Sequence, residues 1–248
     1  MKKLWPLVVL GVVSYLVFAI WTLPASVLLR WLPANVHVDG VHGTAWHGTA
    51  AVVQVDSAML GEARWSLHPL ALFLARLKAD VNLKRTDGFA QGLISASASQ
   101  IKITDVAGSL PLAALPQQVA PGGWTGTLNL RLSNLQIAQG WPTAIDGTVE
   151  ILQLTGPARS PTNIGSYKVT FPAATASNDA STLIGAITDV GGPIQIAGTL
   201  QLKSDHSYVI DGLIAARPDA PRDVQNALQF LGAPDAQGRR PFSLSGTL

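Results

Sequence analysis

An uncharged segment near the N-terminus constrains this chain more than any other feature. No charged residue lies between Lys3 and Arg30, and Leu, Val, Ala, Trp and Phe dominate residues 4–29. A helix needs roughly 20 apolar residues to cross the ~30 Å hydrocarbon core of a bilayer. Lys2 and Lys3 precede the segment, and basic flanks tend to stay in the cytoplasm. The sequence therefore predicts a single-pass inner-membrane anchor, with the rest of the chain in the periplasm of a Gram-negative cell.

A cleaved secretory signal is the alternative reading of the same segment. Signal peptides have apolar cores of about 7–15 residues followed by small residues at the cleavage site. The run here is longer, and Leu23-Pro24-Ala25 is a weak substitute for such a site. Trp5 and Trp21 bracket the run, as interfacial aromatic residues do. We therefore expect residues 1–33 to form a cytoplasmic stub and a retained anchor, and residues 34–248 to form one periplasmic β domain.

The charge of the predicted domain differs from that of the whole chain. Removing Lys2, Lys3 and Arg30 from the 17 basic residues leaves 14, against 15 acidic residues. A domain so close to neutrality makes nucleic acid a poor candidate partner. The chain has no cysteine, which excludes disulfides, thiolate metal sites and cysteine nucleophiles. The domain must therefore be stabilised by its own packing.

Short runs with alternating apolar and polar residues recur from Val36 onward. Period-two alternation places the apolar side chains on one face of a strand. The clearest runs are residues 79–84, 100–104, 126–132, 147–154, 198–203, 207–211 and 242–248. Their spacing predicts a mainly β fold, an antiparallel meander with one or two short helices. We expect the helices over residues 69–76 and 221–231, the second ending at Gly232.

Gly-Thr pairs recur beside these runs. Glycine allows the tight bend that ends a turn, and β-branched threonine favours a strand. We therefore expect the pairs to open strands. They are Gly43-Thr44, Gly48-Thr49, Gly126-Thr127, Gly147-Thr148, Gly198-Thr199 and Gly246-Thr247.

No catalytic, cofactor-binding or metal site is predicted. His37, His42 and His47 are separated by odd intervals, so a single strand cannot present all three on one face. Ser204, Asp205 and His206 are adjacent, whereas triad members come from separate elements, and we expect a hairpin turn there. Residues 189–193 are glycine-rich but lack the lysine and following helix of a phosphate loop, which indicates a turn between strands. The chain is expected not to be an enzyme.

Four tryptophans are the large aromatic residues of the predicted domain. Trp46, Trp65, Trp124 and Trp141 each lie close to a glycine or proline. Core packing is the ordinary role of such residues, and a partner-binding surface is the other. Sheet edges also invite strand addition by a partner. We take the four tryptophans as a candidate partner surface.

The order of several short motifs resembles one known family. The motifs are Gly43-Thr-Ala-Trp46-His-Gly48, Ala63-Arg-Trp65-Ser-Leu-His-Pro69, Ser109-Leu-Pro-Leu112, Gly140-Trp-Pro142, Ile164-Gly-Ser-Tyr167, Asp189-Val-Gly-Gly-Pro-Ile194 and Leu228-Gln-Phe-Leu-Gly232. Together with the anchor, they make the chain similar to type II secretion system protein N along nearly its whole length. The resemblance implies a non-catalytic accessory subunit that supports export of folded proteins across the outer membrane, with no cofactor.

The resemblance also implies partners among the other secretion subunits, and we expect the inner-membrane connector or the outer-membrane secretin. Two readings from other classes remain open. An open β-sheet with one apolar face could bind or transfer lipid in the periplasm. A periplasmic hydrolase is the third reading, although no nucleophile and base stand out in the sequence.

Overall fold

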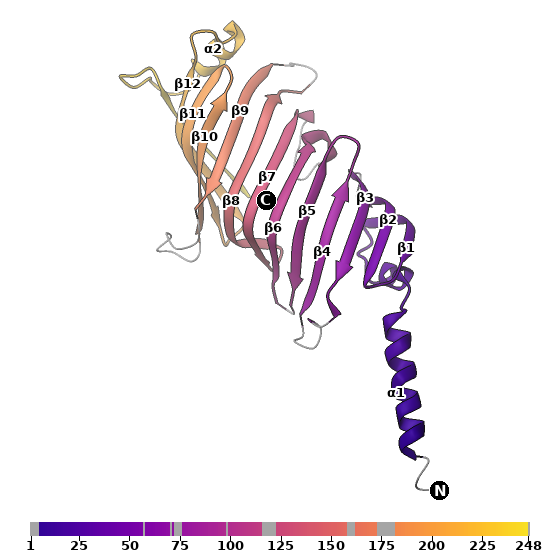
Figure 1. The fold of residues 1–248 in the computed structure, drawn as a ribbon. Coiled ribbons are helices and arrows are strands. Elements are labelled where there is room, and N and C mark those ends of the chain that lie inside the picture. Colours follow the sequence, from indigo (N-terminus) through magenta and orange to yellow (C-terminus); the bar gives the residue numbers. More distant parts are fainter. Residues whose placement is uncertain are drawn as a thin grey trace.

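A computed structural model describes residues 5–56, 58–69, 71, 76–97, 99–115, 123–157, 162–172 and 182–247. In these residues, strands β1–β13 form one antiparallel sheet in which every strand pairs with its neighbours in the chain (Figure 1). The strands are β1 (Val36–Gly43), β2 (His47–Val55), β3 (Ala58–Leu67), β4 (Leu77–Lys84), β5 (Phe89–Ala96), β6 (Ile101–Pro111), β7 (Thr125–Ala138), β8 (Trp141–Thr155), β9 (Asn163–Phe171), β10 (Thr182–Gly191), β11 (Ile194–Lys203), β12 (Ser207–Ala216) and β13 (Arg240–Thr247).

The predicted antiparallel meander is confirmed. Apart from Gln100, which precedes β6, the described residues of the alternating runs lie in strands. Strands β7 and β8 extend well beyond the predicted ranges, to 14 and 15 residues. Gln139 and Gly140 join these two strands, both with positive φ (53° and 79°). Two such residues form the turn that matches the right-handed twist of a hairpin.

The prediction that Gly-Thr pairs open strands is wrong at four of the six positions. Gly43 is the last residue of β1, and Gly246-Thr247 is the end of β13. Gly147 lies in the middle of β8, and Gly198 in the middle of β11. Their role is steric: a Cβ on Gly198 would lie 3.0 Å from Cα of Gly212 on the next strand. Glycine therefore permits close cross-strand approach inside the sheet rather than a turn before it.

Helices are few, as predicted. The helix α1 (Trp5–Trp21) precedes two short 3₁₀ helices, η1 (Ala25–Trp31) and η3 (Leu112–Ala114), and α2 (Arg222–Leu228) lies between β12 and β13. No helix in the described part of the chain has both the length and the apolarity to cross a membrane. The N-terminal span is thus unconfirmed. The helix expected over residues 69–76 falls mostly outside the described residues.

Figure 1 shows the sheet as a long twisted band, with α1 projecting away from its β1 end and α2 close to the last strands. The band is curved as well as twisted. The Trp141 ring at the start of β8 stacks on His206 in the β11–β12 turn, with ring centroids 4.8 Å apart. Flat strands that are three places apart in a sheet would be about 14 Å apart. Curvature of the sheet brings the two hairpin ends together.

Candidate functional site

The sheet has one apolar face, and the strand register shows its extent. Directly paired residues form a first row that crosses all thirteen strands without a polar side chain. The first row is Val41, Ala50, Ala63, Leu83, Ala90, Gly108, Leu130, Val149, Val169, Ile187, Gly198, Gly212 and Phe242.

A second row lies two residues along each strand, on the same face, and also lacks polar side chains. The second row is Gly43, Gly48, Trp65, Val81, Gly92, Val106, Leu132, Gly147, Phe171, Gly185, Leu200, Ile210 and Leu244. Successive side chains of a strand point to opposite faces, so the residues between the rows form the other face. On that face Thr49, Arg64, Asn82 and Gln91 are paired across β2–β5.

The apolar face is the sheltered side of the sheet. Its second row contains Leu132 and Phe171, which are 7% and 6% exposed, and its first row contains Ala50, which is fully buried. On the opposite face Glu150 pairs with Lys168 across β8 and β9 at 3.1 Å, with both side chains about one-third exposed. The described residues include no buried polar or charged side chain. Burial is therefore confined to one side of the sheet.

No second sheet covers this face in the described part of the chain. The whole chain exposes 15883 Å². A folded monomer of 26.0 kDa is expected to expose only about 10,500 Å². The excess is consistent with an extended molecule, to which the exposed residues of α1 contribute.

Four glycines on the apolar face lie beneath aromatic rings of the adjacent strand. The pairs are Gly48 with Trp65, Gly185 with Phe171, Gly212 with Phe242, and Gly246 with Tyr208. A Cβ on any of these glycines would come within 3.0 Å of a ring atom. Each ring covers the backbone that the glycine leaves bare, which compensates for the weak packing of glycine in a strand.

The end of the sheet beside α1 is tied to that helix by hydrogen bonds. The indole of Trp46 donates to the carbonyl of Ile20 at 2.8 Å, and the amide of Ala45 donates to the carbonyl of Leu23 at 2.8 Å. Pro24 and Thr44 form an isolated bridge. These contacts join the C-terminal end of α1 to the β1–β2 connection. The helix is therefore attached to the sheet by more than the covalent chain.

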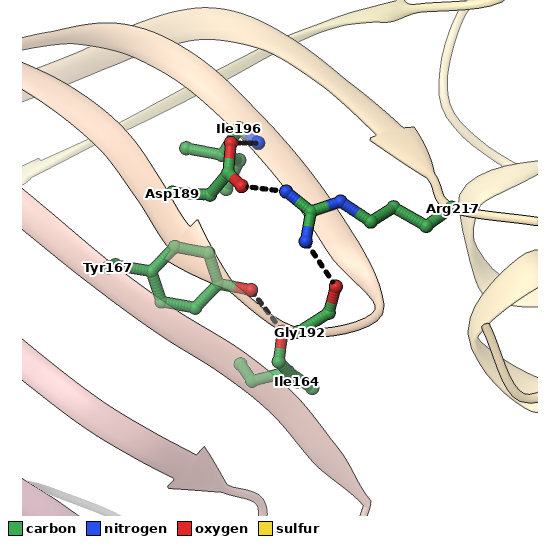
Figure 2. Close-up of polar contacts among 6 residues, drawn as sticks. All are labelled: Ile164, Tyr167, Asp189, Gly192, Ile196 and Arg217. Atoms are coloured by element: carbon green, nitrogen blue, oxygen red, sulfur yellow. Dashed lines mark hydrogen bonds and ion pairs between the residues drawn. The ribbon is translucent and has the colours of Figure 1, made fainter. Parts of the chain in front are cut away.

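The far end of the apolar face carries a compact polar cluster (Figure 2). The carboxylate of Asp189, only 13% exposed, forms an ion pair with Arg217 and accepts a hydrogen bond from the Ile196 amide at 3.3 Å. Arg217 also donates to the carbonyl of Gly192 at 2.9 Å. The pair thus joins the β10–β11 turn to the end of β12.

Tyr167 lies beside this ion pair and donates its phenolic hydrogen to the carbonyl of Ile164 (Figure 2). Burial raises the pKa of Tyr167 to about 12, with a further increase from the Asp189 charge and a decrease from Arg217. A phenol with that pKa stays neutral at physiological pH, so it serves as a hydrogen-bond donor and not as an acid.

Next to the cluster, α2 packs on the apolar face. Its buried side chains Val224 and Leu228 contact Ile194 of β11, and Ile214 of β12 packs against the same group. The apolar spacing of residues 221–231 predicted this helix. Asp189 and Arg217 were not identified as a pair from the sequence, because they lie 28 residues apart and no local pattern connects them.

The four tryptophans lie at different places along the sheet. Trp46 and Trp65 are partly buried at the α1 end, where the Trp65 indole donates to the carbonyl of Ala45 at 3.2 Å. Trp141, at the start of β8, stacks on His206. Trp124 lies beside the other end of β8, because its neighbour Thr125 pairs with Thr155. Trp124 is 36% exposed. The tryptophan surface remains a prediction, with three of its four rings engaged inside the chain.

The residues considered for chemistry are dispersed or already paired. Asp205 accepts hydrogen bonds from the amide and hydroxyl of Ser207, which holds the predicted β11–β12 turn. These bonds, mainly that of the Ser207 hydroxyl, lower the pKa of Asp205. His206 stacks on Trp141 instead of contacting a serine. The described residues contain no cluster of three metal-ligating side chains.

Comparisons with known proteins agree with this architecture. Residues 34–243 match the family described as "Type II secretion system (T2SS), protein N". The chain belongs to this family. It is 29% identical to type II secretion system protein N of Aeromonas hydrophila, over the full length of both chains. It is also 29% identical to the protein of that name from Vibrio cholerae, over 91% of each chain.

A third relative of the same name, from Aeromonas salmonicida, is 34% identical over 47 residues, which are 19% of this chain. No solved structure matches the chain significantly. The resemblance seen in the short motifs is thus confirmed at the level of the family. Membership fits a component of secretion machinery, although it assigns no role to individual residues.

Proposed function

We propose that this chain is a non-catalytic accessory subunit of the type II secretion machinery, anchored in the inner membrane by residues 4–29. The family supports the secretion role. The uncharged N-terminal segment supports the anchor. Residues 34–248 then form the periplasmic domain. In this role the sheet supports export of folded proteins by contacting other subunits, and the anchor confines those contacts to a thin layer next to the membrane.

The observation that carries the proposal is the junction between α1 and the sheet. The hydrogen bonds from Trp46 to Ile20 and from Ala45 to Leu23 fix the β1–β2 connection to the end of the apolar helix. A helix held in the membrane would therefore hold the β1 edge of the sheet close to the membrane surface. Strand β13 would be presented to partners at the other edge of the sheet.

Strand β13 is the surface we propose for the partner. It pairs with β12 on one side, and the pairing of the described residues assigns no strand to its other side. Residues 241–247 carry no charge, and Leu244 is 54% exposed. An uncharged edge strand with unpaired backbone groups favours addition of a partner strand. The connector of the inner membrane and the secretin of the outer membrane are the candidate partners.

The test combines deletion, localisation and partner recovery. Deleting the gene should abolish secretion of folded enzymes while the envelope remains intact, and the tagged chain should recover the connector or the secretin from native detergent extracts. Lysines at an edge strand discourage strand addition. Ser243→Lys together with Ser245→Lys should therefore abolish recovery, whereas Thr127→Lys together with Asn129→Lys, on interior strand β7, should not. Recovery of neither subunit by the unmodified chain would refute the partner assignment.

A further inference from the structure

A hollow of about 360 Å³ lies where α2 meets the end of β12 and the start of β13. Its polar lining consists of two guanidinium groups, Arg217 and Arg240, and two side-chain amides, Gln225 and Gln229. None of the described residues that line it is acidic. A guanidinium donates hydrogen bonds and cannot accept them. The lining therefore favours an anionic ligand.

The carboxylates of this region leave Arg240 without a counter-ion among the described residues. Asp189 is paired with Arg217, and Asp235 is paired with Arg239 at 2.9 Å. The two acidic residues just before α2 and in its first turn do not line the hollow. The positive charge of Arg240 is thus available to a ligand from outside the chain.

Arg240 is held in place before any ligand arrives. Its Nη1 donates to the carbonyl of Leu231 at 3.2 Å and to the carbonyl of Gly232 at 2.7 Å, just after the end of α2. The N–H groups on Nε and Nη2 have no partner in the part of the chain that the structure describes. A side chain that is already ordered loses little conformational freedom when it binds, which favours affinity.

The hollow adjoins the edge strand that we propose for the partner. Arg240 is the first residue of β13, and Pro241 is the second. On an edge strand, proline lies where its missing N–H would face solvent. The backbone groups of alternate residues point the same way, so those of Ser243 and Ser245 also face outward. A partner segment that pairs with these serines and continues past Pro241 would reach the hollow.

We infer that the hollow binds the carboxylate of an acidic residue in the partner segment that pairs with β13. The inference rests on the proposed function, because that function supplies the partner. A guanidinium fits a carboxylate well, since two of its N–H groups can donate to the two oxygens side by side. Continuity with the strand edge favours a peptide over a free anion. The charge pair would also fix the register of the added strand.

Gln229 allows a test that leaves both arginines in place. Its exposed side chain lines the hollow, and the bonds of Arg240 to the end of α2 do not involve it. Gln229→Lys adds a positive charge to the hollow, and Gln229→Glu adds a negative one. Ala227 is exposed on roughly the opposite side of the same helix. Ala227→Lys and Ala227→Glu are therefore the matched controls.

The full-length chain in detergent is titrated with a fluorescent peptide of alternating valine and glutamate, and with the same peptide carrying glutamine in place of glutamate. The glutamate peptide should bind more tightly than the glutamine peptide. Gln229→Lys should lower its dissociation constant about two- to fivefold and Gln229→Glu should raise it as much, the range of exposed charge pairs. The variants at position 227 should change it little.

Equal binding of the two peptides, binding of neither, or equal effects at positions 229 and 227 would each overturn the inference. So would displacement of the glutamate peptide by an equal concentration of inorganic phosphate, which indicates a general anion site. Recovery of the connector and the secretin is measured with the same chains. Peptide discrimination without recovery of either subunit refutes the partner assignment alone, whereas recovery that is equal in all variants, with equal binding of the two peptides, refutes the carboxylate site alone.

Discussion

Removing the guanidinium of Arg217 should strongly weaken the far end of the sheet. Asp189 is 13% exposed, and its carboxylate has two partners among the described residues, Arg217 and the Ile196 amide. In Arg217→Met the aliphatic stem remains, but the carboxylate keeps its charge and loses its counter-ion. A half-buried charge that loses its partner destabilises the fold, because water reaches it only in part.

The expected loss of stability in Arg217→Met follows from the exposed fractions of the two side chains. Breaking a fully buried ion pair costs about 3–5 kcal/mol. Arg217 is 36% exposed, so water can partly solvate the carboxylate after the substitution. We therefore expect Arg217→Met to cost about 2–3 kcal/mol of local stability. Asp189→Asn in the same background removes the unpaired charge and keeps an acceptor for Ile196, so the double variant should cost less than about 1.5 kcal/mol.

Hydrogen exchange of peptides from β10–β12 measures this local free energy directly, because it reports opening of one part of a sheet without requiring global unfolding. The four chains of the Asp189 and Arg217 cycle provide the coupling energy, which we expect to be at least about 1 kcal/mol. Additive effects of the two single variants would refute the reasoning. So would a loss below about 0.5 kcal/mol in Arg217→Met, which is the range of ordinary surface substitutions.

Three further predictions concern the same half of the sheet. The difference between the ultraviolet titration curves of the unmodified chain and of Tyr167→Phe should show a phenol with a pKa near 12. Because the folded state binds this proton more tightly than the unfolded state, the free energy of unfolding should fall as the pH rises from 10 through 12. A titration midpoint near 10 would contradict this. Gly185→Val should lower the free energy of unfolding by about 1–3 kcal/mol, because the new side chain clashes with Phe171. Ala186→Val, on the exposed face, should lower it by less than about 0.5 kcal/mol. Equal losses of stability in the two variants, measured by hydrogen exchange, would refute the ring contact. Leu228→Ala should cost about 2–4 kcal/mol and release α2 in the same assay, whereas Phe230→Ala, at a residue 92% exposed, should have almost no effect.

Seven of the thirteen strands were predicted as runs in the sequence, because apolar and polar residues alternate clearly in them. Alternation in residues 126–132 identifies β7 from the sequence alone, since nothing else produces period two in so short a run. The ends of the strands could be predicted less well from the sequence. The extension of β8 to Thr155 depends on its pairing with both β7 and β9, which no local pattern encodes.

The Gly-Thr pairs show why local propensity misled. A glycine before a threonine is typical of a turn followed by a strand, but Gly147 and Gly198 face close backbone or small residues on the next strand. Whether a glycine serves a turn or a close approach is decided by the partner strand, and the partner is known only when the register is known.

The roles of the tryptophans could not be predicted from the sequence for a related reason. A buried or half-buried indole needs an acceptor for its N–H group. Trp46 finds its acceptor in Ile20, 26 residues earlier, and Trp65 finds its acceptor in Ala45, 20 residues earlier. Both acceptors are backbone carbonyls, which every residue has. The amino-acid sequence therefore has no signal that distinguishes a tryptophan engaged in this way from one that waits for a partner.

The strand order has a consequence for how the subunit would work. Because each strand pairs with its neighbours in the chain, the sheet is built of local contacts, and among the described residues no distant strand closes it. An edge strand therefore remains at β13, and an apolar face remains along the band. Closure of both would have required a second layer or a barrel. An isolated chain gains nothing from leaving this edge open, so the open edge at β13 favours a function in which a partner strand supplies the missing backbone contacts.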